Sequence, residues 1–323
     1  MRNFTLARPK DADAAFTDIG ADGAYIAGGT DLMQLMKDYV AVPSRVVDID
    51  AGVVADSVTV MPDGLRIAAG AKMSDVAAHP AVARDYPVVA QALLASASPQ
   101  VRNMASIGGN LLQRTRCGYF RDVGFPCNKR VPGSGCPAIA GENRMHAILG
   151  GSAQCVATNA SDLAVALMAM EATLDLHGPQ GVRQVPLAKF HVLPGDTPQR
   201  ETVLRPAELI TAIVLPATAW LRRSAYLKVR DRASFEWAVV SAAVALDVEA
   251  GRIRDARVAL GGVGTKPWRS PAAEAALRGQ PADEASFAAA AQVAVRDAKP
   301  LCENGFKVVL AQRAMVRALA TLV

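Results

Sequence analysis

The sequence lacks any apolar run long enough to cross a bilayer. The longest apolar stretches in its 323 residues, such as 238–246, are much shorter than the run of about 20 residues that a membrane-spanning helix needs. The first residues, MRNFTLARP, have neither the apolar segment nor the cleavage pattern of a secretory signal. We therefore expect no membrane span and no export signal carried by this chain itself.

Several motifs of common enzyme classes are also absent. The sequence contains no Gly-x-Gly-x-x-Gly fingerprint, no Gly-Lys-Ser/Thr of a P-loop, no Gly-x-Ser-x-Gly elbow and no His-Glu-x-x-His. Basic residues outnumber acidic ones by only 35 to 30, and no basic stripe alternates with aromatic side chains. The absences argue against a Rossmann dehydrogenase, a P-loop NTPase and a nucleic-acid-binding protein.

The composition is that of an ordinary globular protein, with 51% hydrophobic and 20% charged residues. In the first fifty residues we expect a helix over 11–18, a strand over 23–27, a glycine turn and a strand over 45–49. Thr30 and Asp31 should begin a helix after the turn, because their side chains can accept hydrogen bonds from its first N–H groups.

The remaining elements follow the same patterns. Strands over 58–60 and 65–69 should form a hairpin around 62–64, and helices are expected over 74–83 and 86–95. Further along the chain we expect strands over 173–176, 208–216, 224–230, 238–248 and 253–262, and helices over 163–171, 271–277, 285–295 and 304–322.

Two separate diglycine turns, Gly28-Gly29 and Gly108-Gly109, are candidate binding elements. Glycine lets the backbone approach a ligand closely, and exposed N–H groups at a helix start favour phosphate. The pair of turns would suit a dinucleotide whose pyrophosphate lies between two subdomains. The first turn taken alone is explained about as well by a structural role.

Four of the five cysteines, Cys117, Cys127, Cys136 and Cys155, lie in one loop rich in Gly, Pro, Arg and Lys. Their spacing has no C-x2–4-C knuckle of the kind that is typical of structural zinc. An iron–sulfur cluster tolerates wider spacing, and the basic residues 114, 116, 121, 129 and 130 would moderate its negative charge. Four unrelated thiols remain the alternative.

Two further interpretations concern single side chains. Cys302 lies outside the group, near the start of the last helix, and we expect a buried free thiol there. A nucleophilic cysteine would need a histidine and an acid, and only His146 lies near the cysteines in sequence, without a recognisable signature.

Four motifs in order along the chain carry a family resemblance. Residues 24–32 (AYIAGGTDL), 106–110 (SIGGN), 161–162 (SD) and 228–235 (KVRDRASF) resemble the FAD-binding medium subunit of the xanthine dehydrogenase family of molybdenum hydroxylases. The insertion, with 110–117 (NLLQRTRC), 127–130 (CNKR) and 132–136 (PGSGC), resembles the [4Fe-4S]-carrying flavin subunit of periplasmic aldehyde oxidoreductases. 4-Hydroxybenzoyl-CoA reductase has a related insertion.

This resemblance implies an α+β fold. Residues 1–219 would form a PCMH-type FAD-binding domain, with subdomains of about 1–52 and 53–219 and an iron–sulfur loop at 111–157. Residues 220–323 would form a C-terminal domain of the CO dehydrogenase flavoprotein type.

The resemblance also implies roles for individual residues. Asp162 would bind the ribityl or ribose part of FAD, with Ile210 and Lys228 beside the flavin, although Ile210 could equally be core and Lys228 a solvated surface residue. The cradle of the pyrophosphate would consist of Ala24, Tyr25, Ile26, Ala27, Gly28, Gly29, Thr30, Asp31, Leu32, Ser106, Gly108, Gly109 and Asn110. The ligands of a [4Fe-4S] cluster would be Cys117, Cys127, Cys136 and Cys155.

By the same resemblance the chain is an electron-transfer subunit of a heterotrimeric aldehyde oxidoreductase, and no side chain in it is required as a general acid or base. A large partner would hold the molybdenum cofactor and a small one two [2Fe-2S] clusters, and an external acceptor would take the electrons. The complex would be periplasmic, exported on a partner's twin-arginine signal, with the cytoplasm as the alternative. The rival functions are a zinc-stabilised scaffolding protein and a stand-alone flavoenzyme of the vanillyl-alcohol oxidase fold.

Overall fold

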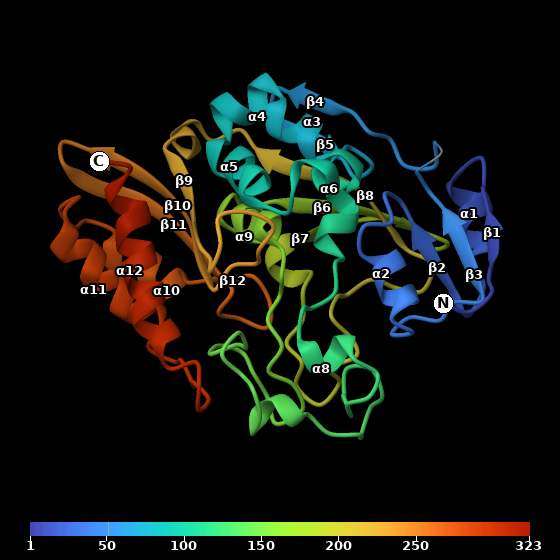
Figure 1. Cartoon of the computed structure of the whole chain (residues 1–323). Coiled ribbons are helices and arrows are strands. Elements are labelled where there is room, and N and C mark those ends of the chain that lie inside the picture. The colour runs from blue at the N-terminus through green and yellow to red at the C-terminus, as the bar shows by residue number, and fades with distance from the viewer. Residues whose placement is uncertain (51) are drawn as a thin grey trace.

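The computed structural model describes residues 1–50 and 52–323 (Figure 1). Three sheets follow one another along the chain, and Figure 1 shows the second of them between the N-terminal unit and the C-terminal domain. The expected subdomain boundary near residue 52 adjoins residue 51, which lies outside the described residues. No helix in the described ranges is long and apolar enough to span a membrane.

The N-terminal unit has the predicted order of strand, glycine turn, helix and strand. Its parallel sheet has the order β1-β3-β2, with β1 (Thr5–Ala7), β2 (Gly23–Ile26) and β3 (Arg45–Asp48). Its helices are α1 (Ala12–Asp18) and α2 (Leu32–Lys37). The predicted helix start is confirmed, since α2 follows Asp31 directly, but the expected capping bond of the Asp31 side chain is not made. Arginines of the cysteine-rich loop bind its carboxylate instead.

The middle unit is an antiparallel sheet with helices packed on it. The strand order is β4-β5-β8-β6-β7, with β4 (Val58–Met61), β5 (Gly64–Ala68), β6 (Thr173–Gly178), β7 (Gly181–Pro186) and β8 (Leu209–Pro216). The predicted hairpin is confirmed, since Met61 pairs with Gly64. The helices are α3 (Met73–Ala78), α4 (Pro80–Asp85), α5 (Pro87–Ala95), α6 (Pro99–Met104), α7 (Ile107–Leu111) and α9 (Asp162–Ala169), and the 3-10 turns are η2 (Leu187–Lys189) and η3 (Ala219–Arg222).

The helix predicted over 74–83 is in fact two helices. Pro80 has no N–H to continue the hydrogen-bond ladder, and its ring disfavours a helical conformation at His79. His79 accordingly adopts extended dihedral angles, ending α3 and starting α4. The proline therefore divided a segment whose apolar periodicity predicted one continuous helix.

The cysteine-rich loop, 111–157, has little regular structure. Its helical segments are α8 (Gly118–Arg121) and the 3-10 turn η1 (Pro137–Ile139). Figure 1 shows the loop around α8 extending from one end of the middle unit. Side chains hold much of its backbone instead: Arg130 donates to the carbonyls of Tyr119 and Phe120, and Asn128 Oδ1 accepts from Gly135 N.

The C-terminal domain is a four-stranded antiparallel sheet whose two faces are both covered. Its strand order is β12-β11-β10-β9, with β9 (Ser224–Val229), β10 (Val240–Glu249), β11 (Arg252–Gly261) and β12 (Trp268–Arg269). On β10, Ala242 and Val244 pack with helices α10 (Pro271–Leu277), α11 (Glu284–Ala294) and α12 (Phe306–Ala320), whereas Ala243 packs toward the middle unit. Alternate residues of a strand face opposite sides, so one strand serves both cores.

Helix α9 fills the space between the middle unit and this sheet. All eight of its residues are buried, and it contacts α5 on one side and β10 and β11 on the other. Its first residue is Asp162. The start of this buried helix thus brings a carboxylate to the junction of the two domains.

Candidate cofactor site

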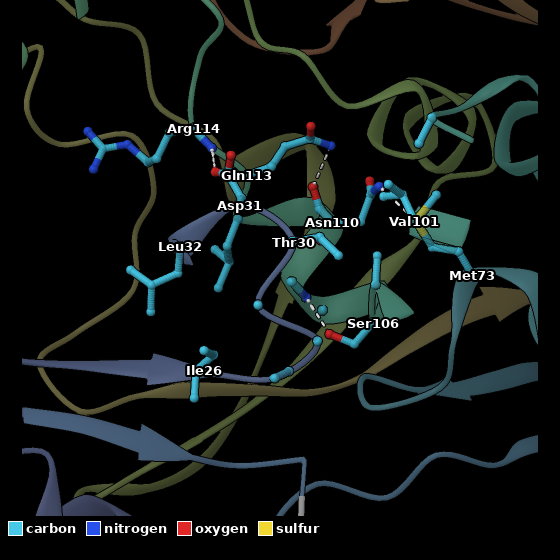
Figure 2. Close-up of a pocket in the computed structure, with 18 of the residues that line it drawn as sticks. Ile26, Thr30, Asp31, Leu32, Met73, Val101, Ser106, Asn110, Gln113 and Arg114 are labelled. Carbon is cyan, nitrogen blue, oxygen red and sulfur yellow. Dashed lines mark hydrogen bonds between the residues drawn. The ribbon is translucent and has the colours of Figure 1, made fainter. Parts of the chain in front are cut away.

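One pocket brings together every residue that the sequence suggested for FAD. It has a volume of about 530 Å³ and lies between the N-terminal unit, the middle unit and β9. Figure 2 shows Ile26, Thr30 and Asp31 on one wall, facing Ser106 and Asn110. Its walls include Ala24, Tyr25, Ile26, Ala27, Gly28, Gly29, Thr30, Asp31, Leu32, Ser106, Gly108, Gly109, Asn110, Asp162, Ile210 and Lys228. Which of these contact the flavin nucleotide stays a prediction.

The first glycine turn packs directly against the chain that leads into the second. A Cβ atom at Gly28 would lie 1.8 Å from the carbonyl oxygen of Met104, so no side chain fits there. Gly29 has φ +68°, in the left-handed region that glycine adopts without strain. The two halves of the cradle therefore meet through bare backbone, which leaves their N–H groups near the same space.

The second glycine turn is fixed by hydrogen bonds to the middle sheet. Ser106 caps α7 by accepting from Gly109 N at 3.2 Å, and Gly108 N donates to Ala69 O at 2.8 Å. Asn110 Oδ1 accepts from Ser161 Oγ at 2.6 Å. This last bond ties the SIGGN motif to the SD motif, 51 residues further along the chain.

Asp162 is the centre of a buried hydrogen-bond network. Its carboxylate accepts from Lys228 Nζ at 2.7 Å, from Tyr226 Oη at 2.5 Å and from Ser96 Oγ at 2.9 Å. The side chains of Lys228 and Asp162 are only 3% and 6% exposed, so the solvated-surface alternative for Lys228 was wrong. Burial, with the charge of Asp162, raises the pKa of Tyr226 well above its usual value.

Ile210 is both a core residue and a pocket residue, so the two alternatives for it do not exclude each other. It lies on β8, is buried, and belongs to the core of the middle unit, while it also lines the pocket. Its side chain therefore forms part of an apolar floor. This combination is common where a ligand site is built on the edge of a core.

Asp31 joins the first glycine turn to the cysteine-rich loop. It accepts hydrogen bonds from Arg114 N at 2.8 Å, Arg116 Nη1 at 2.6 Å and Arg121 Nη2 at 2.7 Å. Burial alone would raise the pKa of Asp31, but these donors outweigh it and hold the pKa below its usual value. Two of the arginines expected to moderate a cluster's charge, Arg116 and Arg121, thus pair with Asp31, whereas the side chain of Arg114 pairs with Glu201.

Several pocket residues were missed by the sequence reasoning, Ser96 and Trp237 among them. Ser96 is a polar residue in a helix-rich segment, and nothing in its neighbours points to a bond with Asp162. Trp237 is the second residue after the KVRDRASF motif, and the guanidinium of Arg116 lies 5.0 Å from its ring centroid. An aromatic residue so close to the motif was the available signal.

The four loop cysteines line a second, small pocket. Cys117, Cys127, Cys136 and Cys155 all border it, and all four thiols are free. Burial raises the pKa of Cys117 to about 12, although the backbone N–H groups of Phe120 and Tyr119 oppose the shift. For Cys155 burial also raises the pKa, while the nearby Lys129 ammonium lowers it in part.

The donor set of this pocket consists of cysteine thiols. In the described part of the chain no group of three or more His, Cys, Asp or Glu side chains is placed to hold one metal ion. Four thiols on one pocket, without a carboxylate, are nonetheless the donors that a [4Fe-4S] cluster takes, one for each iron. A set of four cysteines also binds zinc, so the preference for a cluster rests on the wide cysteine spacing and on the lack of a three-donor group for one ion among the described residues.

The other thiol and the nearby histidine differ from expectation. Cys302 is exposed rather than buried, and accepts a hydrogen bond from Asn143 Nδ2 at 3.1 Å. His146 Nε2 lies 3.1 Å from Cys117 Sγ. Burial and the Lys307 charge lower the pKa of His146 to about 4, and a Cys117 thiol with a raised pKa is a poor nucleophile.

A further cavity, of about 760 Å³, adjoins both pockets. Cys117 and His146 line it from the cysteine-rich loop, and Asp162 and Trp237 line it from the side of the first pocket. Arg116 borders this cavity and the first pocket alike. This cavity therefore lies between the cysteine pocket, with which it shares Cys117, and the first pocket, with which it shares Arg116, Asp162 and Trp237.

Comparison with known proteins decides the family. Residues 2–218 match the family model described as FAD binding domain in molybdopterin dehydrogenase, and residues 224–322 match the CO dehydrogenase flavoprotein C-terminal domain. The chain belongs to the FAD-binding medium subunits of the molybdenum hydroxylase family. It is an oxidoreductase subunit with FAD as its cofactor, and both the predicted family and the predicted α+β fold class are confirmed.

Individual relatives extend this result. The chain is 45% identical to the aldehyde oxidoreductase FAD-binding subunit PaoB of Escherichia coli K12, over 99% of this chain and 98% of that protein. It is 27% identical to the carbon monoxide dehydrogenase medium chain of Afipia carboxidovorans, over 84% and 78%. The solved structure of quinoline 2-oxidoreductase from Pseudomonas putida 86 shares the fold, with TM-score 0.77, 21% identity and coverage of 99% and 97%.

Proposed function

We propose that this chain is the FAD- and [4Fe-4S]-binding electron-transfer subunit of a heterotrimeric, molybdenum-containing aldehyde oxidoreductase. The observation that carries the proposal is the position of four free thiols on one pocket, next to the FAD pocket, in a chain 45% identical to an aldehyde oxidoreductase subunit. FAD and the cluster would be the electron carriers, and the residues of this chain would bind each of them in its own pocket.

The residues of the first pocket have distinct tasks in this proposal. The bare backbone at Gly28 and Gly109 lets the FAD pyrophosphate approach N–H groups of both glycine turns. Asp162, already held by Lys228, offers a fixed carboxylate edge for hydroxyl groups of the ribityl chain or the ribose. Ile210 excludes water from the apolar floor.

Cys117, Cys127, Cys136 and Cys155 would hold the cluster as thiolates. Iron binding displaces their protons, so the pKa raised by burial does not prevent ligation once the metal is present. Lys129, only 8% exposed and close to Cys155, supplies positive charge against the thiolates. The cluster loop is an insertion between Asn110 and Asp162, so both of its ends are anchored at the FAD pocket.

The partners and the compartment are part of the same proposal. A large subunit would carry the molybdenum cofactor that oxidises the aldehyde, and a small subunit would carry two [2Fe-2S] clusters that pass electrons to this chain. An external acceptor would then take them. The complex would reach the periplasm on a twin-arginine signal of a partner subunit.

One experiment tests these statements together. The tagged chain is purified from its host without oxygen, and its partners, FAD, iron, zinc and molybdenum are measured. We expect two partner subunits, one FAD and about four irons in excess of those in the small subunit. Zinc in place of this iron, or purification of the chain without partners, would contradict the proposal.

A matched pair of variants tests the ligand assignment. Cys127→Ser should lose the four irons and retain FAD, because Cys127 lines the cysteine pocket but not the FAD pocket. Cys302→Ser is the control, since Cys302 is exposed and outside the pocket, and should retain both cofactors. Equal iron contents in the two variants would refute the assignment of Cys127.

A further inference from the structure

Cys117, one of the four cysteines of the proposed cluster site, contacts the side chain of His146, to which the proposed function assigns no role. His146 Nε2 lies 3.1 Å from Cys117 Sγ, and His146 is only 7% exposed. Within residues 1–50 and 52–323, no other side chain hydrogen-bonds to the sulfur of any of the four cysteines in the pocket. Cys117 is therefore distinguished from the other three.

The C-terminal domain holds this histidine in place through its backbone. His146 O accepts hydrogen bonds from Lys307 Nζ at 3.1 Å and from Asn304 Nδ2 at 3.2 Å. Both donors are fully buried. His146 N donates to Asn143 O at 2.9 Å, so the backbone of the residue is fixed on both sides. Among the described residues the buried Nδ1 of the ring has no hydrogen-bond partner, so Nε2 makes the polar contact of the ring, with Cys117 Sγ.

The direction of the hydrogen bond follows from the chemistry of the ligand. A thiolate bound to iron has no proton, so Cys117 Sγ can only accept, and Nε2 must carry the hydrogen. An N–H donor stabilises negative charge on sulfur, and an iron–sulfur cluster carries more negative charge when reduced. We infer that His146 is a positioning residue that raises the reduction potential of the proposed cluster through an Nε2–H···Sγ bond to Cys117.

The location of the bond gives it a function. Cys117 and His146 line the cavity of about 760 Å³ that also reaches Asp162 and Trp237 at the FAD pocket. The tuned thiolate is thus the one on the side of the flavin. A higher potential there favours keeping an electron on the cluster, and the role requires no covalent bond to change and no proton to leave the imidazole.

This inference rests on the proposed function, and a redox titration of the purified complex separates the two. The midpoint potential of the [4Fe-4S] signal is followed by electron paramagnetic resonance. We expect a lower midpoint in His146→Phe, which has no donor, and recovery of much of the difference in His146→Gln, whose amide retains an N–H. The flavin midpoint should stay unchanged, and His177→Phe, a substitution on β6, is the control.

The possible outcomes separate the inference from the proposed function. Equal midpoints in wild type and His146→Phe would overturn the inference while the cluster stands. Absence of any [4Fe-4S] signal in wild type would overturn the proposed function and the inference with it. If His146→Phe fails to retain the cluster, wild-type complex with ¹⁵N-labelled histidine gives the answer, because a hydrogen bond to sulfur produces a ¹⁵N coupling in pulsed resonance spectra and its absence refutes the bond.

Discussion

Arg116 and Asp31 form an ion pair that joins the two candidate cofactor sites. Arg116 Nη1 lies 2.6 Å from Asp31 Oδ1, and the side chains are 19% and 16% exposed. Arg116 immediately precedes Cys117, and Asp31 lies two residues after Gly29. A change in the conformation of the cysteine-rich loop is therefore transmitted to the first glycine turn, and the reverse also holds.

Asp31→Asn should weaken both sites at once. The substitution leaves Arg116 and Arg121 mostly buried without their counter-charge, which we expect to lower stability by about 1–3 kcal/mol. FAD and iron contents should fall together. Asp231→Asn, which breaks the half-exposed pair with Arg144, is the control and should change stability by less than about 1 kcal/mol. Loss of one cofactor with full retention of the other would contradict the coupling.

Gly28→Val should prevent FAD binding. A Cβ atom there meets the Met104 carbonyl at 1.8 Å, so the first glycine turn must move away from the chain that leads into the second. Flavin absorbance per protein after gel filtration measures the effect. At Gly305 no heavy atom lies within 4 Å of a Cβ position, so Gly305→Ala should keep its flavin. Full flavin content in Gly28→Val would refute the close approach.

The Lys228–Asp162 pair calls for a double-variant cycle. Removing either partner alone leaves a buried charge uncompensated, and each single variant should lose about 3–5 kcal/mol of unfolding free energy. The double variant Asp162→Asn/Lys228→Met should lose less than the sum of the two. If the pair also contacts the flavin, FAD affinity stays low in the double variant. Recovery of wild-type FAD affinity would assign the pair a purely structural role.

Lys307 should make stability depend on pH. Burial lowers its pKa in the folded protein to about 7, from the usual 10.5, with a smaller contribution from Arg144. Between these values the unfolded chain binds more protons than the folded one, so Lys307 contributes a stability increment that rises with pH, by at most about 1.4 kcal/mol per pH unit. Below pH 7 both states are protonated and this slope vanishes.

Thermal unfolding of Lys307→Met and wild type at pH 7 and pH 9 measures this contribution. Wild type should gain more stability than the variant over that interval, because groups other than Lys307 titrate alike in both. Lys299→Met, a change at an exposed lysine, should follow the wild type. Identical pH dependence in Lys307→Met and wild type would show that the buried amine does not titrate in this range.

The parts of the site that could be predicted from sequence are those with chemically distinctive residues. Gly28 and Gly108 have no room for a side chain, and each belongs to a glycine pair, which predicts close approach of the backbone. The clustering of four cysteines in a loop without periodicity likewise predicted a shared pocket. In these cases a local pattern is sufficient, because a glycine pair and a group of thiols each have few structural roles to choose from.

Other features depended on contacts that local sequence does not contain. Asp31 could cap α2 or pair with distant arginines, and in the structure it pairs with the arginines. These lie 85 and 90 residues away in the sequence, so no local pattern could show that the fold places them next to Asp31. Ser96 belongs to the site through its hydrogen bond to Asp162, which lies 66 residues further along the chain. Cys302 was expected to be buried because free cysteines usually are, yet the turn before α12 leaves it exposed.

Helix α9 joins the two domains. Its eight residues are all buried, three of them are alanines, and they contact α5 in the middle unit as well as β10 and β11 in the C-terminal domain. Strand β9, which carries Lys228, also contacts α5 directly. A larger side chain at any of these alanines would therefore disturb both domains at once, next to the pocket that Asp162 and Lys228 line.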